Sequence, residues 1–106
     1  MIYNFDYYKQ LVSPNMYLCN PNLTPICALN GQNRELTLRF NDLSELTFRV
    51  YKSDTTDEKD FNLIETKRLI FIEKIGWFEI TNAQEQIEGD SCYKEVTAQS
   101  HQVVFK

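Results

Sequence analysis

The stretch RELTLRFNDLSELTFRV, residues 34–50, contains two similar segments, RELTLRF and SELTFRV, which begin ten residues apart. Every second residue of each segment is apolar: Leu36, Leu38 and Phe40 in the first, and Leu46, Phe48 and Val50 in the second. A period of two is typical of a β-strand that buries one face. The stretch is therefore predicted to form two adjacent strands that share a buried face, rather than an evolutionary repeat.

The apolar residues also predict how the two strands pair. Residues directly opposite each other in an antiparallel pair lie on the same face of the sheet. Matching apolar with apolar sets Phe40 opposite Leu46, Leu38 opposite Phe48 and Leu36 opposite Val50. A slip by one residue would turn the whole apolar set to solvent, so this register is favoured. It leaves Leu43 at the tip of the turn, where we expect a neighbouring subunit to cover it.

Other segments with strand character follow along the chain at intervals of roughly ten residues. The expected strands are Ile2 to Asp6, 16–20 (MYLCN), 25–29 (PICAL), 68–73 (RLIFIE), 77–86 (WFEITNAQEQ) and 92–100 (CYKEVTAQS). RLIFIE is apolar enough to be buried on both faces. Thr55 and Glu58 have the spacing of a capping box, which predicts a short helix through about Thr66. We expect one mainly β domain over residues 1–106, an antiparallel barrel-like or sandwich fold with one short helix.

The composition excludes several classes of function. The formal net charge is −4, which argues against a nucleic-acid-binding surface, since such proteins neutralise phosphates with Lys and Arg. No apolar run approaches the roughly 20 residues that span a bilayer. The start of the chain, MIYNFDYYKQL, lacks the basic and apolar regions of a signal peptide. We expect a protein made in the cytoplasm, with no specific nucleic-acid binding and no membrane association.

No catalytic, cofactor or metal site is predicted. Cys19, Cys27 and Cys92 are interpreted as free thiols in a reducing compartment, although Cys19 and Cys27 could face each other across two strands. A zinc site needs four ligands, which one His and three scattered Cys do not supply. His101 directly follows Ser100, and neighbours on a strand point to opposite faces, so the two cannot form a nucleophile–base pair.

Surface residues offer candidate interaction sites, in contrast to the absence of a predicted catalytic site. Trp77 and Phe78 are interpreted as core plus rim, with a stacking platform for a glycan or peptide as the alternative. The segment QVVFK, residues 102–106, ends the sequence on an apolar alternation, as if the natural chain continued or paired with another subunit. The predicted interface residues are Leu43, Trp77, Phe78, His101, Val103 and Phe105.

Four segments in series resemble a known family. They are 43–48 (LSELTF), 68–72 (RLIFI), 76–80 (GWFEI) and 96–100 (VTAQS). In this order they are similar to the N-terminal region of siphophage and prophage tail proteins, the prophage endopeptidase tail or tail-associated lysin family. The likeness covers most of residues 30–102.

The resemblance implies a structural role as the hub at the distal end of a phage tail. Members of the family form trimers whose N-terminal domains make a ring on the distal tail protein and contact the tape-measure protein. The chain is then expected to be the N-terminal part of a longer virion tail protein and not an enzyme, because the lytic domains of the family lie further along. The alternatives are an autonomous glycan- or peptide-binding β module and, less favoured, a small hydrolase.

Overall fold

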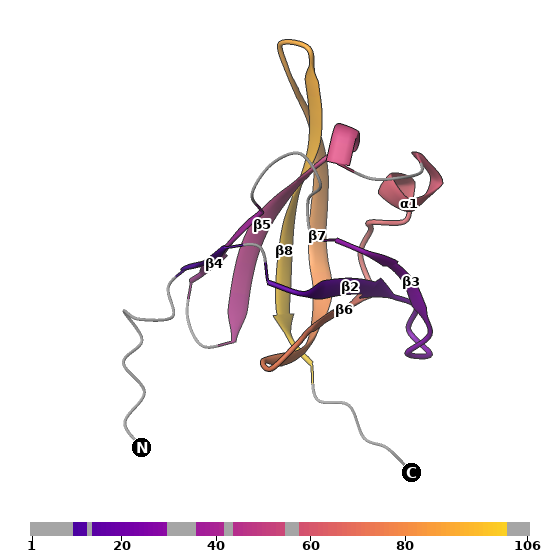
Figure 1. The fold of residues 1–106 in the computed structure, drawn as a ribbon, viewed down its shortest axis with the longest axis vertical. Helices are drawn as coiled ribbons and strands as arrows, with labels where there is room; N and C mark the ends of the chain where they lie inside the picture. Colours follow the sequence, from indigo (N-terminus) through magenta and orange to yellow (C-terminus); the bar gives the residue numbers. More distant parts are fainter. Residues whose placement is uncertain (1–9, 13, 30–35, 42–43, 55–57, 102–106) are drawn as a thin grey trace.

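The structure, a computed structural model, describes residues 10–12, 14–29, 36–41, 44–54 and 58–101. Within these ranges, eight antiparallel strands form one sheet in the order β1-β4-β5-β8-β7-β6-β2-β3 (Figure 1). The strands are β1 (Gln10–Val12), β2 (Met16–Cys19), β3 (Pro25–Ala28), β4 (Thr37–Phe40), β5 (Glu45–Tyr51), β6 (Leu69–Ile72), β7 (Gly76–Glu88) and β8 (Ser91–Ser100). A 3₁₀ turn, η2 (Lys52–Asp54), and the short helix α1 (Glu58–Asn62) join β5 to β6.

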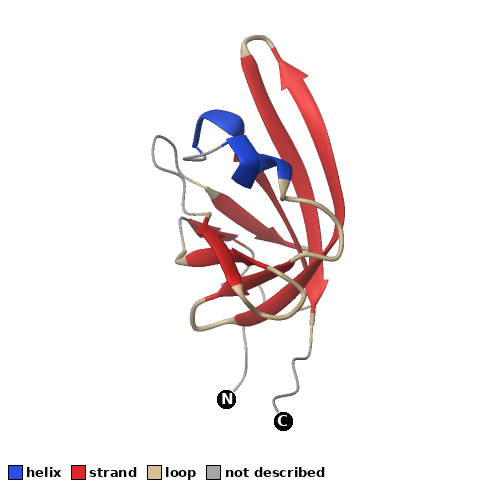
Figure 2. Cartoon of the chain, turned by 90° about the vertical axis from the view of Figure 1, so that its right-hand side faces the viewer, coloured by secondary structure: helices blue, strands red, loops and turns tan. Residues whose placement is uncertain are grey.

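The sheet is strongly bent but not closed. β2, β3 and β6 cross over the long strands β5, β7 and β8, so that the two halves of the sheet face each other (Figures 1 and 2). In the described part of the chain, the end strands β1 and β3 each pair on one side only. The mainly β, antiparallel fold with one short helix is therefore confirmed, and of the two predicted architectures the sandwich is the one adopted.

The two strands of the opening stretch pair in the predicted register. Phe40 lies opposite Leu46, and Arg39 lies opposite Thr47. The buried apolar residues of the stretch are Leu36, Leu38, Leu46, Phe48 and Val50. Phe40 is half-buried and meets the ring of Phe78 edge to face, with 6.4 Å between the ring centroids. Apolar matching across the pair thus places one continuous face in the core. Leu43 lies outside the described residues.

β6 supplies apolar side chains to both faces of the sheet, as RLIFIE suggested. Ile70 and Ile72 are fully buried in the core, together with Met16 and Leu18 of β2. Leu69 and Phe71 alternate with them and so point to the opposite face. Leu69 is nevertheless buried and Phe71 half-buried. The outer face of this half of the sheet is therefore apolar, which is unusual for an antiparallel sheet with one face toward solvent.

A β-bulge interrupts the pairing of β7 with β8. Ile80 lies opposite Ala98 and Asn82 opposite Thr97, so that Thr81 is the extra residue. Its hydroxyl donates a hydrogen bond to the carbonyl of Thr97 at 3.2 Å. Beyond the bulge the two strands continue as a hairpin that extends past the rest of the molecule (Figures 1 and 2). Gly89 closes it with φ of +62°, a conformation that glycine adopts without strain.

Three sequence expectations differ from the structure or lie beyond it. α1 ends at Asn62 rather than near Thr66; beyond it Ile64 is fully buried in the core and Leu63 is half-buried against it. Thr55 of the capping box and the expected strand Ile2 to Asp6 lie outside the described residues. β7 runs two residues further than expected, to Glu88.

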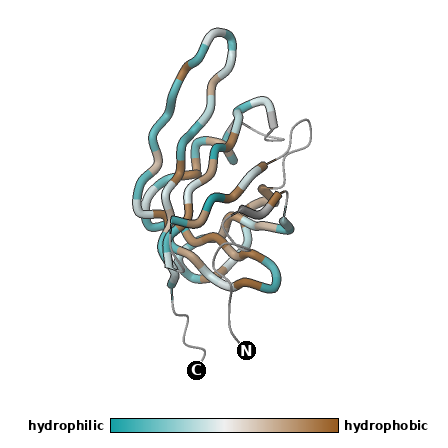
Figure 3. Tube along the Cα trace, turned by 90° about the vertical axis from the view of Figure 1, so that its left-hand side faces the viewer, coloured by the Kyte–Doolittle hydropathy of each residue, from teal (hydrophilic) through white to brown (hydrophobic). Residues whose placement is uncertain are grey.

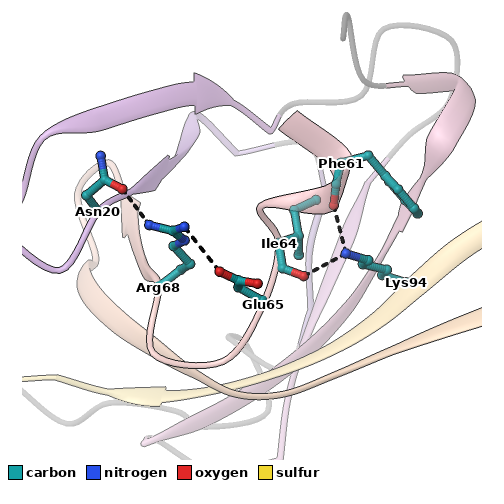
Figure 4. A network of polar contacts seen from close by, with 6 residues as sticks. All are labelled: Asn20, Phe61, Ile64, Glu65, Arg68 and Lys94. Atoms are coloured by element: carbon teal, nitrogen blue, oxygen red, sulfur yellow. Dashed lines mark hydrogen bonds and ion pairs between the residues drawn. The ribbon is translucent and has the colours of Figure 1, made fainter. Parts of the chain in front are cut away.

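Two long cationic side chains tie the segment around α1 to the sheet (Figure 4). Lys94 of β8 donates hydrogen bonds from Nζ to the carbonyls of Phe61 and Ile64, both at 2.9 Å. Its ammonium also lies over the ring of Phe61, 4.9 Å from the centroid. Burial lowers the pKa of Lys94 from its usual value. Lys94 thus satisfies the carbonyl groups at the end of a helix too short to be stable alone.

Arg68 makes the second connection. Its guanidinium donates to Asn20 Oδ1 at 2.5 Å and to Glu65 Oε1 at 3.1 Å (Figure 4). Asn20 belongs to the turn between β2 and β3, and Glu65 to the segment that follows α1. One side chain therefore joins the sheet edge to the loop that carries Phe61 and Ile64 into the core.

Replacing Lys94 with Met tests the role of its ammonium, because Met keeps the apolar stem and removes the two hydrogen bonds. The free energy of unfolding should fall by about 1–3 kcal/mol, since two carbonyls lose their donor. Urea denaturation measures it. Lys74→Met in the exposed β6–β7 turn is the control and should change stability by no more than about 0.5 kcal/mol. A Lys94→Met protein as stable as the control would contradict the assignment.

Candidate interaction surfaces

Three aromatic side chains form a row across the outer face of β2, β6 and β7. Tyr17 lies opposite Phe71, and Phe71 lies opposite Trp77, so register alone places them on one face. The rings of Phe71 and Trp77 are 4.9 Å apart and tilted by 48°. All three side chains are half-buried. We call Tyr17, Phe71 and Trp77 the aromatic row.

Polar groups border the aromatic row where β8 ends. His101 donates its backbone N–H to the carbonyl of Trp77 at 2.9 Å. Its ring Nδ1 lies 3.5 Å from a carboxylate oxygen of Glu79, and both side chains are about two-fifths exposed. Glu79 faces Leu69 across the β6–β7 pair. The row is thus an apolar strip with an ionisable pair at one end, a composition common at protein interfaces.

The structure places the predicted interface residues in different environments. Trp77 belongs to the aromatic row, and His101 lies beside it. Phe78 is only 4% exposed and packs in the core of its own chain, so the prediction that it reaches a partner is wrong. Neighbours on a strand point to opposite faces, so Trp77 and Phe78 cannot form one stacking platform. Leu43, Val103 and Phe105 lie outside the described residues.

Sequence reasoning missed two members of the row, Tyr17 and Phe71. The signal was present in RLIFIE, whose apolar residues occupy both strand faces instead of alternating with polar ones. It could indicate a second apolar surface but not the partner of Phe71. That partner follows from the register of β2, β6 and β7, which brings together residues 17, 71 and 77.

A second surface lies on the other half of the sheet. The outer face of β4, β5 and β8 forms an open basin of about 300 Å³. Its lining residues are Thr37, Arg39, Thr47, Phe48, Arg49, Tyr51 and Glu95. Two guanidinium groups and one carboxylate give this basin a net positive charge within an acidic protein. We refer to it as the basic basin.

The two arginines of the basic basin have different surroundings. Arg49 lies over the ring of Tyr93 at 4.8 Å from the centroid, and its Nε is 3.9 Å from Glu95. A hydrogen bond with Tyr51 raises the pKa of Arg49, with Tyr93 and Glu95 adding to the effect. Arg39 is exposed and has no ion-pair or hydrogen-bond partner among the described residues. Arg49 is thus fixed in place, whereas Arg39 is free to bind an anionic group.

The thiols are free, and one of them is poorly reactive. Cys19 is buried, and Cys27 and Cys92 are half-buried. Burial raises the pKa of Cys27 to about 11, and the charges of Asp60 and Cys19 add to the rise. The thiolate is the nucleophilic form, so this environment opposes nucleophilic catalysis by Cys27. Within the described ranges, no three side chains of His, Cys, Asp or Glu converge on a common point.

The raised pKa of Cys27 predicts slow alkylation in the folded protein. At pH 8, a pKa of about 11 instead of 9.0 lowers the thiolate fraction about 100-fold. Iodoacetamide should therefore modify Cys27 at least about 100-fold more slowly in the folded protein than in denaturant. Mass spectrometry of the Cys27 peptide measures the two rates. Because the pKa is raised on folding, the stability linked to this thiol is present below pH 9 and is lost as the pH rises towards 11. Equal alkylation rates in the two conditions would refute the assignment.

Comparison with known protein families, with curated proteins and with solved structures found no match. No helix in the described residues is long and apolar enough to cross a bilayer.

Proposed function

We propose that this chain is a structural component of a phage tail, the N-terminal hub domain at the distal end of the tail tube. In this role it self-assembles and binds the distal tail and tape-measure proteins. The sequence resemblance to tail hub proteins supports the proposal, and so does the position of the segments that carry it. Residues 43–48, 68–72, 76–80 and 96–100 fall in or beside β5, β6, β7 and β8, which are adjacent in the sheet. The likeness therefore concerns one contiguous part of the fold.

The observation that carries a role in assembly is the aromatic row. Tyr17, Phe71 and Trp77 are half-buried on the face of the sheet opposite the core and retain some exposed surface. Tyr and Trp are enriched at the centres of protein interfaces, where they bury large apolar area at low entropic cost. Leu69 and Cys19 are buried on the same face beside the row, so the row itself is the part that a partner can reach. A partner that covers the row would remove all three rings from water.

The location of the protein tests the proposed function. An antibody against this chain should label the distal end of tails purified from the phage or induced prophage that encodes it. Immunogold electron microscopy and mass spectrometry of the particles provide the measurement. Particles that lack the chain altogether would refute a structural role in the tail, and label along the tube would refute the position at its tip.

Binding through the aromatic row is tested with Trp77→Ser and Phe71→Ser. Each should weaken binding to the distal tail protein encoded beside this chain by about tenfold or more, because truncating a central aromatic residue commonly costs 2 kcal/mol or more, about 30-fold. Tyr51→Ser, which removes a half-buried ring from the other half of the sheet, is the matched control. Calorimetric titration measures affinity, and thermal unfolding shows whether each variant is folded. Unchanged affinity in both row variants would exclude the row as the contact.

The stacked pair of Phe71 and Trp77 also favours a second candidate, an autonomous module that binds a glycan or peptide. Paired rings at 4.9 Å offer apolar faces to a sugar ring or an aromatic side chain. The two candidates differ in the state of the protein. A monomer that is absent from tail particles and binds a glycan array through Trp77 would support the module over the hub.

A further inference from the structure

The outer part of the β7–β8 hairpin carries an exposed apolar residue between acidic ones. Ile87 is 76% exposed, the highest value among the exposed large apolar side chains of the described residues. Glu88 follows it on the opposite face of the strand and Asp90 lies in the turn, and both are exposed, with no ion-pair partner within the described chain. Figure 3 shows a hydrophobic stretch on the otherwise hydrophilic end of this hairpin. We call Ile87, Glu88 and Asp90 the hairpin tip.

The basic basin has the complementary chemistry. Arg39 offers a guanidinium that has no partner among the described residues. Val12 of β1 lies opposite Thr37, which lines the basin, and so borders it on the same face. Val12 is 55% exposed. The basin thus has an exposed apolar residue, Val12, near the unpaired cation Arg39. The hairpin tip has an exposed apolar residue, Ile87, near two unpaired anions.

The hairpin tip cannot reach the basin of its own chain. Glu95 lines the basin and belongs to β8, the same strand that carries the hairpin. Asp90 is five residues from Glu95 in the sequence, which is about 16 Å along an extended strand. Continuous pairing of β7 with β8 up to Glu88 and Ser91 holds the tip at the far end of the projecting hairpin (Figure 2). A hairpin tip that enters the basin would therefore have to come from another copy of the chain.

We infer that the hairpin tip of one copy docks in the basic basin of a second copy. The carboxylates of Glu88 and Asp90 pair with Arg39, and Ile87 covers Val12 at the border of the basin. Because the tip and the basin are different surfaces of one chain, the contact is head to tail. Such contacts build a ring when the rotation closes. The inference deepens the proposed function, on whose self-assembly it rests, by naming the two surfaces that would join the copies.

Charge exchange tests this interface directly. One variant carries Arg39→Glu, and the other carries Glu88→Lys with Asp90→Lys. In each variant alone, tip and basin have charges of the same sign, and we expect self-association to weaken about tenfold or more. When the two are mixed, each contact between unlike variants joins a tip to a basin of opposite charge, so mixed pairs should form far more readily than pairs of either variant alone. Sedimentation velocity across a range of protein concentrations measures both effects.

Three controls make the result specific. Lys74→Glu applies the same charge change as Arg39→Glu at an exposed turn and should leave association unchanged. Ile87→Ser should weaken association without altering its dependence on salt, whereas salt of about 0.5 M should weaken the wild-type assembly because it screens the ion pairs. Thermal unfolding verifies that every variant is folded, as expected for exposed side chains without partners.

The outcomes separate this inference from the proposed function. Three outcomes would each overturn the docking of tip in basin. The wild-type chain could stay monomeric at all concentrations, the variants could associate normally alone, or the mixture could fail to recover association. A chain found at the tail tip in spite of such a result would keep the proposed function. Conversely, recovery by the mixture for a chain absent from tails would establish the interface and refute the function.

Discussion

The pairing of β8 on both of its sides is the constraint on which the rest of the structure depends. β8 pairs with β5 from Tyr93 to Gln99 and with β7 over almost its whole length. Strand alternation then directs Val96 and Ala98 into the core and Glu95 and Thr97 to the outer face. A single strand thus provides the centre of the core, one wall of the basic basin and one arm of the projecting hairpin. Any change of its register would displace all three together.

The bulge at Thr81 determines which side chains of β7 lie on each face of the hairpin. Before it, Phe78 and Ile80 point into the core; after it Ala83 packs against the core, and Ile87 lies on the same face of the strand but is exposed. The extra residue therefore changes the parity of β7, and bulges also increase the local twist of a strand. Without it, Ile87 would lie on the other face of the hairpin. The face on which Ile87 lies thus depends on one inserted residue several positions away.

The parts of the fold that sequence reasoning predicted are those fixed by local pattern. The register of Phe40 with Leu46 followed from apolar residues that had only one favourable arrangement. The parity change in β7 was not predicted, although the apolar positions switch from even to odd numbers between Ile80 and Ala83. The bending of the sheet into two facing halves could not be predicted, since it depends on contacts between strands that are distant in sequence. For the same reason, only the structure reveals that Arg49 contacts Tyr93 and Glu95. The same holds for the aromatic row, which three strands form together.

The two outer surfaces lie on opposite halves of one bent sheet, and this separation has a consequence for assembly. The aromatic row lies on β2, β6 and β7, whereas the basic basin lies on β4, β5 and β8. A copy whose basin holds the tip of its neighbour therefore still exposes its row. Apolar contact through the row gives affinity by burying area, and charge pairing in the basin gives register and specificity. In the proposed hub, the first surface would hold a different protein while the second joins identical chains, so that neither contact competes with the other.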